Sequence, residues 1–349
     1  MAAETRRGSE DVVLAVNGLS VRYHVGGTSA TILEGIDLEL GPREMIGVVG
    51  ESGSGKSTLA KALLRLQPRN EVDVSGEVTL NGQDVLSASP RQLRRIRGGS
   101  VGMVLQDAMV SLNPSLTIGF QLVEGIRAHR DVSRAEARKI AIELLELVAL
   151  PDPAKHLRQY PRQLSGGMRQ RVAIAIGICA EPSVLIADEP TSALDVTVQR
   201  QIMVLLRSLQ QRLGMSVIFI THDLDLASEF CDRIMVLYSG RVVETGTAEE
   251  IFTNPQMPYT AGLLACTPRM DAPKSDDAHL PSLRGSIHDS WAASTSCRFA
   301  PRCDFARDVC WAGEPDLTPR HGPAHAARCA GTEEGGWIDG SVQWAQAHA

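Results

Sequence analysis

The stretch Gly50-Glu51-Ser52-Gly53-Ser54-Gly55-Lys56-Ser57-Thr58 decides the fold of this chain, because it matches G-x-x-x-x-G-K-[ST] in full. The apolar run Met45–Val49 before it predicts a buried strand, and residues 58–65 after it predict a helix. Glycines let successive backbone N–H groups point inward, and a helix N-terminus favours an anion. This stretch is therefore predicted to bind a polyphosphate, with Lys56 on the β- and γ-phosphates and the Ser57 hydroxyl on Mg²⁺. Its predicted nucleotide-binding residues are Gly50, Ser52, Gly53, Ser54, Gly55, Lys56, Ser57 and Thr58.

Composition narrows the class of protein. Of 349 residues, 43% are hydrophobic and 22% are charged, which is typical of a globular chain with enough apolar residues for a core. The net charge of −6 does not favour a nucleic-acid partner. No apolar run approaches the roughly 20 residues of a membrane helix, and residues 1–8 lack the apolar core of a signal peptide. We therefore expect a cytoplasmic protein whose membrane role, if any, comes through a partner.

The N-terminal part has the pattern of an antiparallel sheet. Strands are predicted at Asp11–Val16, Leu19–Val25 and Ile32–Leu40, with a turn at residues 26–29. Tyr23, on the second of these strands, has a ring that suits either stacking on an adenine or packing in the core.

The rest of the chain alternates strands with helices, which predicts an α/β fold with a mainly parallel sheet. A helical block at about residues 115–181 interrupts this pattern and is interpreted as an inserted subdomain. Periodicity fades after residue 253, where prolines and small polar residues increase. We therefore expect a nucleotide-binding domain at residues 1–253 and a less regular, cysteine-rich extension at residues 254–349.

Two further motifs carry chemistry. Asp188 and Glu189 follow an apolar strand, so Asp188 is predicted to hold Mg²⁺ and Glu189 to polarise the attacking water; a solvated acidic turn is the alternative. An apolar helix is predicted at Val172–Cys179. Ahead of it, Ser165 suits a helix N-cap, and Gly166 and Gly167 expose backbone N–H groups to an anion. Because the chain already has one phosphate-binding loop, this second site is expected to serve the nucleotide of another molecule.

Taken together, the order of these motifs resembles the nucleotide-binding subunits of ATP-binding cassette (ABC) transporters, over residues 11 to about 250. The resemblance implies a P-loop ATPase with ATP and Mg²⁺ as cofactors. Gln106 resembles the loop glutamine that senses the γ-phosphate and contacts the metal and the membrane subunit. Asp195, in Ser192-Ala193-Leu194-Asp195, resembles the residue that communicates across the dimer. His222 resembles the switch histidine that contacts the γ-phosphate.

Finer features resemble the peptide/nickel importer group, namely Ser111–Pro114, Pro258–Leu264 and Ser296–Cys303. Ala108, Met168 and Met257 depart from that pattern. The resemblance implies an ATPase that drives import of oligopeptides or dipeptides from the cytoplasmic face of the membrane. Its implied partners are two integral permease subunits, a second ATPase subunit (identical or a paralogue) and an extracytoplasmic binding protein. Alternatives are a nickel importer, a soluble ABC ATPase outside transport, and a non-hydrolysing regulatory partner.

Four of the seven cysteines crowd into the extension, with spacing C-x5-C-x6-C-x18-C. Four thiolates in a cytosolic chain suit a tetrahedral Zn²⁺, an iron–sulfur cluster, or simply reduced buried thiols. Resemblance to the peptide-importer extensions favours a structural [4Fe–4S] cluster, whose negative charge Arg298, Arg302 and Arg307 are expected to offset. The predicted ligands are Cys297, Cys303, Cys310 and Cys329.

Overall fold

The computed structural model describes residues 12–68, 70–267, 282–287, 295–320 and 324–332. The predictions for residues 1–11, which include the start of the first strand, lie outside the described residues. The same holds for parts of the expected extension. Within the described ranges, no helix combines the length and the apolar character needed to cross a membrane.

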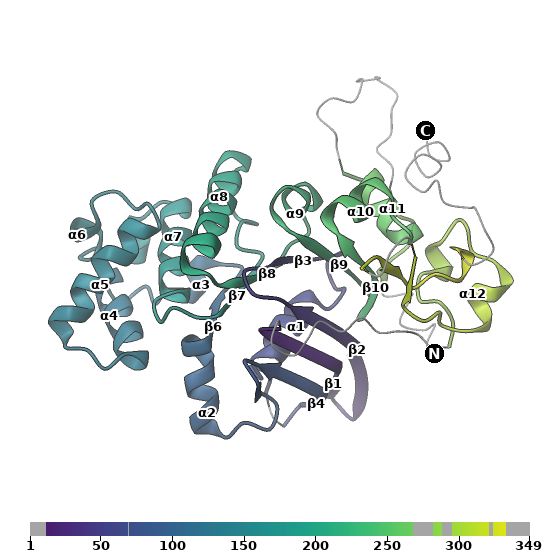
Figure 1. Cartoon of the computed structure of the whole chain (residues 1–349), viewed down its shortest axis with the longest axis horizontal. Helices are drawn as coiled ribbons and strands as arrows, with labels where there is room; N and C mark the ends of the chain where they lie inside the picture. The colour runs from purple at the N-terminus through teal and green to yellow at the C-terminus, as the bar shows by residue number, and fades with distance from the viewer. Residues whose placement is uncertain (1–11, 69, 268–281, 288–294, 321–323, 333–349) are drawn as a thin grey trace.

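A sheet of eight strands runs through the middle of the molecule (Figure 1). Its strands are β3 (Met45–Val49), β6 (Val101–Val104), β7 (Val184–Asp188), β8 (Ser216–Ile220), β9 (Arg233–Tyr238), β10 (Arg241–Thr247), β11 (Thr318–Pro319) and β12 (Ala326–Ala327). Their order is β11-β12-β10-β9-β3-β8-β7-β6. The strands from β9 to β6 are parallel, whereas β10, β12 and β11 add antiparallel pairs at one edge. The predicted mainly parallel sheet is confirmed.

Both faces of the parallel strands are covered, which explains their continuous apolar runs. In β3, Ile46 and Val48 pack into one core, and Met45 and Val49 pack into the other. This follows from the period of two along a strand, which sends successive side chains to opposite faces. The sheet therefore separates two hydrophobic cores and is rigid where its loops carry function.

A second, antiparallel sheet covers one of these faces, as the sequence predicted. It comprises β1 (Leu14–Val25), β2 (Thr28–Leu40), β4 (Val72–Leu80) and β5 (Gln83–Asp84), in the order β2-β1-β4-β5. Two strands were predicted where β1 is continuous. The register shifts near Gly18, whose φ is +59°, absorb the irregularity without ending the strand. The turn before β2 is also shorter than predicted, because Thr28 and Ser29 already pair with β1.

Most of the helices cover the other face and fill the interval between β6 and β7 (Figure 1), whereas α1 (Lys56–Leu63) and α2 (Pro90–Arg95) pack into the core beneath the antiparallel sheet. That interval contains the helical block expected at about residues 115–181. Its longest helix begins after Ser133, whose side chain forms a capping box with Glu136. The helices are α1 (Lys56–Leu63), α2 (Pro90–Arg95), α3 (Ala108–Ser111), α4 (Ile118–His129), α5 (Arg134–Leu147), α6 (Pro153–His156), α7 (Gly166–Gly177), α8 (Val196–Leu213), α9 (Leu224–Phe230), α10 (Ala248–Thr253), α11 (Pro258–Ala265) and α12 (Asp308–Ala312).

The described residues after 253, here called the C-terminal segment, extend the central sheet. In β12, Ala327 pairs with Glu244 of β10, so the segment lies beside β10 (Figure 1). Three buried aromatic rings join it to the sheet. Tyr238 at the end of β9 lies 4.5 Å from Tyr259 and 5.3 Å from Phe299, measured between ring centroids. The C-terminal segment therefore shares a core with the sheet.

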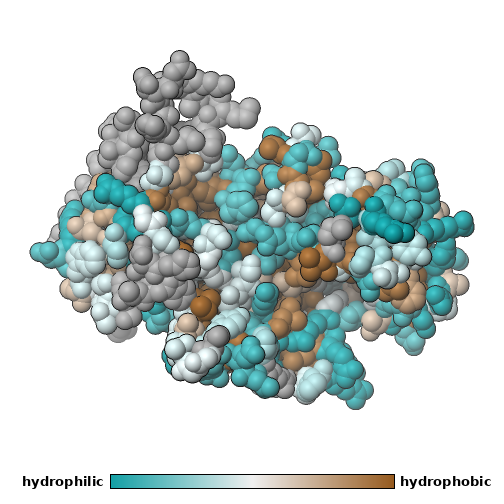
Figure 2. Space-filling view, turned by 180° about the vertical axis from the view of Figure 1, so that it is seen from behind, coloured by the Kyte–Doolittle hydropathy of each residue, from teal (hydrophilic) through white to brown (hydrophobic). Residues whose placement is uncertain are grey.

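The back of the molecule is mostly hydrophilic, with apolar residues in separate patches (Figure 2). Single exposed apolar side chains are normal on a soluble surface. Among the described residues, the most exposed large ones are Val110 in α3 and Val196 in α8, at 78% and 80%.

Candidate active site

The predicted functional side chains meet at one edge of the central sheet. The loop that starts at Gly50 follows β3, Gln106 follows β6, Asp188 ends β7, and His222 follows β8. These strands are parallel and adjacent in the order β3-β8-β7-β6. Since the carboxyl ends of parallel strands lie at the same edge, residues far apart in sequence converge there.

The loop after β3 depends on glycine where the backbone is tight. Gly50 has φ +150°, and a Cβ there would lie 2.2 Å from the carbonyl oxygen of Leu237. Gly55 has φ +107° and precedes α1, which starts at Lys56 and therefore two residues earlier than predicted. A concave loop followed at once by a helix N-terminus is the geometry expected of an anion site.

Lys56 folds back over this loop. Its Nζ donates hydrogen bonds to the carbonyl oxygens of Gly50 at 2.7 Å and Glu51 at 2.9 Å. Burial lowers the pKa of Lys56, whereas the carboxylates of Glu189, Asp188 and Glu51 act in the opposite direction. The lysine is therefore buried among acceptors, and the phosphates of a nucleotide would compete for the same ammonium group.

Asp188 and Ser57 lie together beside Lys56. The Ser57 hydroxyl donates to Asp188 Oδ1 at 3.2 Å, and Asp188 is only 4% exposed. Burial raises the pKa of Asp188 and Glu189 adds to this, while the Ser57 hydrogen bond lowers it. A hydroxyl and a carboxylate side by side are the hard oxygen donors that Mg²⁺ prefers. The pair fits the predicted magnesium site.

The three predicted catalytic residues are brought together. Glu189 Oε2 accepts a hydrogen bond from Gln106 Nε2 at 3.0 Å, and His222 Nδ1 lies 3.4 Å from the same oxygen. Glu189 has φ +45°, which is uncommon outside glycine, and its N–H donates to the carbonyl of Ile220 at 2.9 Å. This turned backbone directs Glu189 away from the path of β7. Gln106 bonds to Glu189, so its further role as a magnesium ligand stays a prediction.

Ser165 caps a helix, as its position suggested. It is the N-cap of α7, where its Oγ accepts a hydrogen bond from the N–H of Met168 at 3.3 Å. The helix was predicted to begin at Val172, but it begins at Gly166. The two glycines are therefore its first residues, and their N–H groups lie at the positive end of the helix dipole.

The same glycines lie against the loop that contains Asp195. A Cβ on Gly166 would lie 3.2 Å from Leu194, and one on Gly167 would lie 2.8 Å from Val198. Asp195 is the N-cap of α8, accepting from Val198 N–H at 3.0 Å. Among the described residues, the hydrogen bonds of Ser165 and Asp195 stay within this region and do not reach the loop after β3. The nucleotide roles predicted for it stay predictions.

Tyr23 lies on β1, half-buried, and packs against the core beneath the antiparallel sheet. It pairs with Ala30 on one side and Val72 on the other. Both interpretations, adenine stacking and core packing, therefore remain open.

Contacts of Glu51 were missed by the sequence reasoning. Its N–H donates to the hydroxyl of Tyr259 at 2.8 Å. Its carboxylate accepts two hydrogen bonds from Arg302, at 2.7 and 3.0 Å. Tyr259 was noticed only as part of an importer-like motif, and nothing local in the sequence marks residues 51 and 302 as partners.

The expectation that nearby arginines offset the charge of a metal cluster needs correction. Arg302 is paired with Glu51, and Arg298 donates to Glu34 and to the carbonyl of Ser239. The positive charges of these two arginines are therefore balanced by glutamates outside the cysteine region.

The four cysteines of the C-terminal segment lie close enough for their thiols to affect one another's pKa. Cys297, Cys310 and Cys329 are buried, and the Cys297 N–H donates to the Cys310 carbonyl at 2.9 Å. Burial raises the pKa of Cys297 and of Cys303 to about 12, and neighbouring thiols add to the effect. Yet no three His, Cys, Asp or Glu side chains within the described ranges form a group that could hold a metal ion. The thiols affect one another's pKa, but within the described residues they do not surround a position that one ion could occupy.

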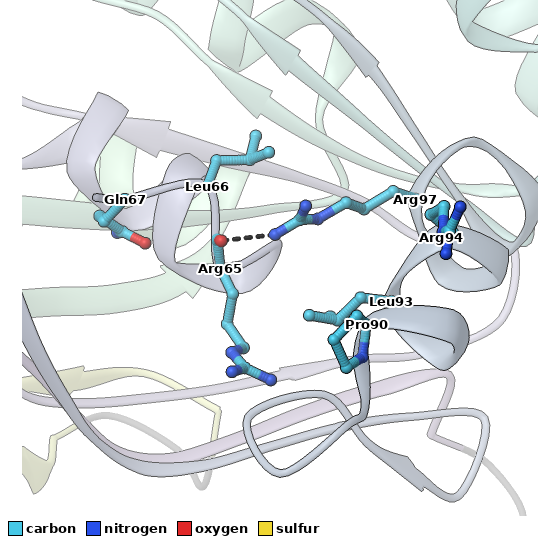
Figure 3. A pocket seen from close by; sticks show the side chains of 7 residues that line it. All are labelled: Arg65, Leu66, Gln67, Pro90, Leu93, Arg94 and Arg97. Atoms are coloured by element: carbon cyan, nitrogen blue, oxygen red, sulfur yellow. Dashed lines mark hydrogen bonds between the residues drawn. The ribbon is translucent and has the colours of Figure 1, made fainter. Parts of the chain in front are cut away.

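The pocket drawn in Figure 3 has a volume of about 440 Å³ and lies beyond the C-terminal end of α1, away from Lys56. Its arginines face backbone carbonyls. Arg97 donates to Leu64 and Arg65 carbonyls, and Arg65 donates to the carbonyl of Ala88 at 2.8 Å. These hydrogen bonds satisfy the carbonyl groups that follow α1, and they connect the end of α1 to the region of α2. The pocket is therefore not part of the nucleotide site. Its lining residues are Arg65, Leu66, Gln67, Pro90, Leu93, Arg94 and Arg97.

Known proteins are similar to this chain in sequence. Residues 33–192 match the ABC transporter family, and residues 243–310 match the C-terminal region of oligopeptide/dipeptide transporters. A putative peptide import ATP-binding protein of Brucella abortus is 48% identical over 317 residues, which cover 91% of this chain and 94% of that protein. A probable peptide ABC transporter ATP-binding protein of Sinorhizobium fredii is 42% identical over 320 residues, covering 91% and 95%.

Solved structures share the fold. A dimeric ATP-binding cassette in a post-hydrolysis state, bound to ADP and Pi, superposes with a TM-score of 0.60 at 32% identity, over 67% of this chain and 98% of that one. The cbiO1 protein of Clostridium perfringens, part of an ABC transporter complex, gives a TM-score of 0.60 at 28% identity, over 72% and 95%. With the phosphate-binding loop, the Asp188–Glu189 pair and His222 assembled at one sheet edge, this chain belongs to the ATP-hydrolysing subunits of ABC transporters, in the oligopeptide/dipeptide transporter family.

Proposed function

We propose that this chain hydrolyses ATP to energise import of oligopeptides or dipeptides through separate membrane permease subunits. The observation that carries the proposal is the placement of Glu189 between Gln106 and His222, next to Lys56, in a chain whose C-terminal segment matches the peptide-transporter region. Its relatives are named as peptide import proteins, which favours peptides over nickel as cargo.

Each side chain at this edge has a role in hydrolysis. Lys56 and the loop amides bind the phosphates, and Ser57 and Asp188 would hold the Mg²⁺ that offsets their charge. The Glu189 carboxylate orients the attacking water and accepts its proton. Gln106 and His222 keep the carboxylate in place through their shared contact with Oε2. His222 is exposed enough to reach a γ-phosphate, since its side chain retains 59% of its accessible surface.

Glu189→Gln tests this assignment, because it preserves the size of the side chain and removes the carboxylate. We expect ATP binding to be kept and phosphate release to fall by about 10²-fold or more. Both are measured on the assembled transporter in vesicles, with peptide and binding protein supplied. Turnover equal to that of the native chain would rule out this role for Glu189.

The complete catalytic unit requires a second ATPase subunit. Ser165, Gly166 and Gly167 form a helix start suited to an anion, yet they bond locally in this chain. We infer that they contact the nucleotide of a facing subunit, identical or paralogous, with Asp195 beside that interface. Ser165→Arg should leave ATP binding by the isolated chain intact and stop hydrolysis at the facing site. Loss of binding by the isolated chain would show that Ser165 acts in its own site.

The permease subunits are proposed to dock on the helices between β6 and β7. These helices and their loops expose Val110, Phe120 and Tyr160, at 78%, 41% and 38%. Docking would place the chain at the cytoplasmic face of the membrane, with an extracytoplasmic binding protein delivering the cargo. Copurification with integral membrane subunits separates this function from that of a soluble ABC ATPase. Stimulation of ATP hydrolysis by peptide, and not by Ni²⁺, separates it from a nickel importer.

We further propose that Cys297, Cys303, Cys310 and Cys329 bind a [4Fe–4S] cluster with a structural role. Four mutually interacting, largely buried thiols supply the required ligand set. Anaerobically purified protein should be brown and carry about four irons per chain. Colourless protein that carries one zinc would show that the same four cysteines bind Zn²⁺ and not a cluster. Metal-free protein with an ordered C-terminal segment would exclude both the cluster and the zinc.

A further inference from the structure

The phosphate-binding loop contains one acidic residue, Glu51, and the C-terminal segment neutralises it. Arg302 approaches Glu51 with both terminal nitrogens, and its side chain is 2% exposed against 29% for Glu51. A bidentate contact between an arginine and a carboxylate fixes the relative orientation of the two side chains and also balances their charges. It joins residues 251 positions apart in the sequence.

Arg302 is held rigidly. Its Nε donates to the Arg284 carbonyl at 2.6 Å, and its guanidinium lies 5.7 Å from the ring centroid of Tyr238 and 5.9 Å from that of Phe299. A short 3₁₀ turn at residues 300–302 sets its backbone, directly before Cys303. The arginine therefore reaches the loop from a fixed platform and has little freedom to follow a loop that moves.

Glu51 in turn lies within electrostatic range of the group that receives phosphate. Its carbonyl oxygen accepts from Lys56 Nζ, its N–H is bonded to Tyr259, and its carboxylate acts on the pKa of Lys56. A second contact lies nearby, because a Cβ on Gly53 would meet Ile287 of the C-terminal segment at 3.4 Å. An unpaired carboxylate here would repel the polyphosphate that the loop must bind.

We propose that Arg302 is a positioning residue for nucleotide binding: it neutralises Glu51 and keeps the start of the phosphate-binding loop in the shape that receives ATP. The C-terminal segment thereby completes the nucleotide site from outside the phosphate-binding loop itself. The proposal rests on ATP binding at this loop. It concerns affinity, since the hydrogen bonds of Arg302 within the described residues go to Glu51, Arg284 and Tyr238 and not to the three catalytic side chains.

The test is a charge-rescue experiment on the full chain with Mg-ATP. Arg302→Gln should raise the dissociation constant and KM for ATP about tenfold, while kcat at saturating ATP stays within about twofold of the native value. Glu51→Gln removes the repelling charge, so the double variant Glu51→Gln/Arg302→Gln should bind ATP within about threefold of the native chain. Arg302→Lys keeps the positive charge but loses the bidentate contact. Its dissociation constant for ATP should therefore lie between those of the native chain and of Arg302→Gln.

Arg298→Gln is the matched control, because Arg298 also connects the C-terminal segment to the rest of the chain but contacts Glu34 and Ser239. Equal weakening of ATP binding by Arg298→Gln, or no rescue in the double variant, would overturn the proposal in favour of general loosening. If Arg302→Gln does not fold, the ATP affinity of Glu51→Gln is compared with that of the double variant. A difference in ATP affinity between these two chains would also overturn the proposal. Absence of ATP binding by the native chain would instead overturn the proposed function, and the inference with it.

Discussion

Glu244 on β10 connects the central sheet to the C-terminal segment through three hydrogen bonds. It is fully buried and accepts hydrogen bonds from the N–H groups of Gln256 at 2.5 Å and Met257 at 3.1 Å, and from His325 Nε2 at 2.8 Å. Glu244→Ala leaves two backbone donors and an imidazole without that acceptor. Unpaired buried donors cost about 1–3 kcal/mol each, and three donors lose their acceptor here. We expect a loss of about 3–5 kcal/mol in the free energy of unfolding.

Urea unfolding followed by circular dichroism measures this loss, and hydrogen exchange locates it at the amides of Gln256 and Met257. Glu244→Gln keeps one carbonyl oxygen and should lose less, about 1–2 kcal/mol. Glu249→Ala, at an exposed position on α10, is the control and should change stability by less than about 0.5 kcal/mol. A Glu244→Ala chain with native midpoint and native amide protection would refute the reasoning that this carboxylate satisfies otherwise unpaired donors.

Two more predictions concern the site and the sheet. Burial raises the pKa of Asp188, so the folded chain binds a proton more tightly than the unfolded chain does, and stability falls as pH rises from the ordinary aspartate value of 3.8 towards the raised one. Asp188→Asn has no carboxyl group to titrate, so its stability should not fall in this way. Its melting temperature at neutral pH should therefore be higher than that of the nucleotide-free native chain, although Mg²⁺-dependent hydrolysis should be lost. Equal melting temperatures of the two chains at every pH would contradict this prediction. Gly102→Ala would place a Cβ 2.0 Å from the Gly177 carbonyl, forcing β6 and α7 apart, whereas Gly313→Ala meets no atom within 4 Å. Thermal unfolding should show a loss of about 1–3 kcal/mol for the first variant only, and equal midpoints would exclude the clash.

Local motifs made most of the site predictable. The loop from Gly50 to Thr58 lies within one short stretch, and Asp188, Gln106 and His222 each follow an apolar run that forms a parallel strand. Because parallel strands end at one edge of a sheet, the prediction of a parallel sheet was enough to bring these residues to the same edge. The start of α7 was placed too late, since glycine is a poor helix former, although the Ser165 cap was recognised.

Long-range pairs were not predictable in the same way. Arg302 and Glu51, or His325 and Glu244, meet only because the C-terminal segment returns to the sheet. None of these residues belongs to a periodic pattern, and a two-residue strand such as β12 is too short to show one. Their partners are set by tertiary packing, which sequence spacing does not encode.

The pairing of β12 with β10 also has a consequence for synthesis. A chain that has emerged only to residue 253 already contains β10 but not its outer neighbour, so its edge N–H and C=O groups can pair with another nascent chain. At about 5–20 residues per second, the ribosome needs several seconds to deliver β12 after β10. During that interval, the unpaired edge of β10 in one nascent chain can associate with a nascent chain made by another ribosome on the same messenger RNA. A translation stall in this window would favour aggregation before the ATPase has any chance to meet its permease.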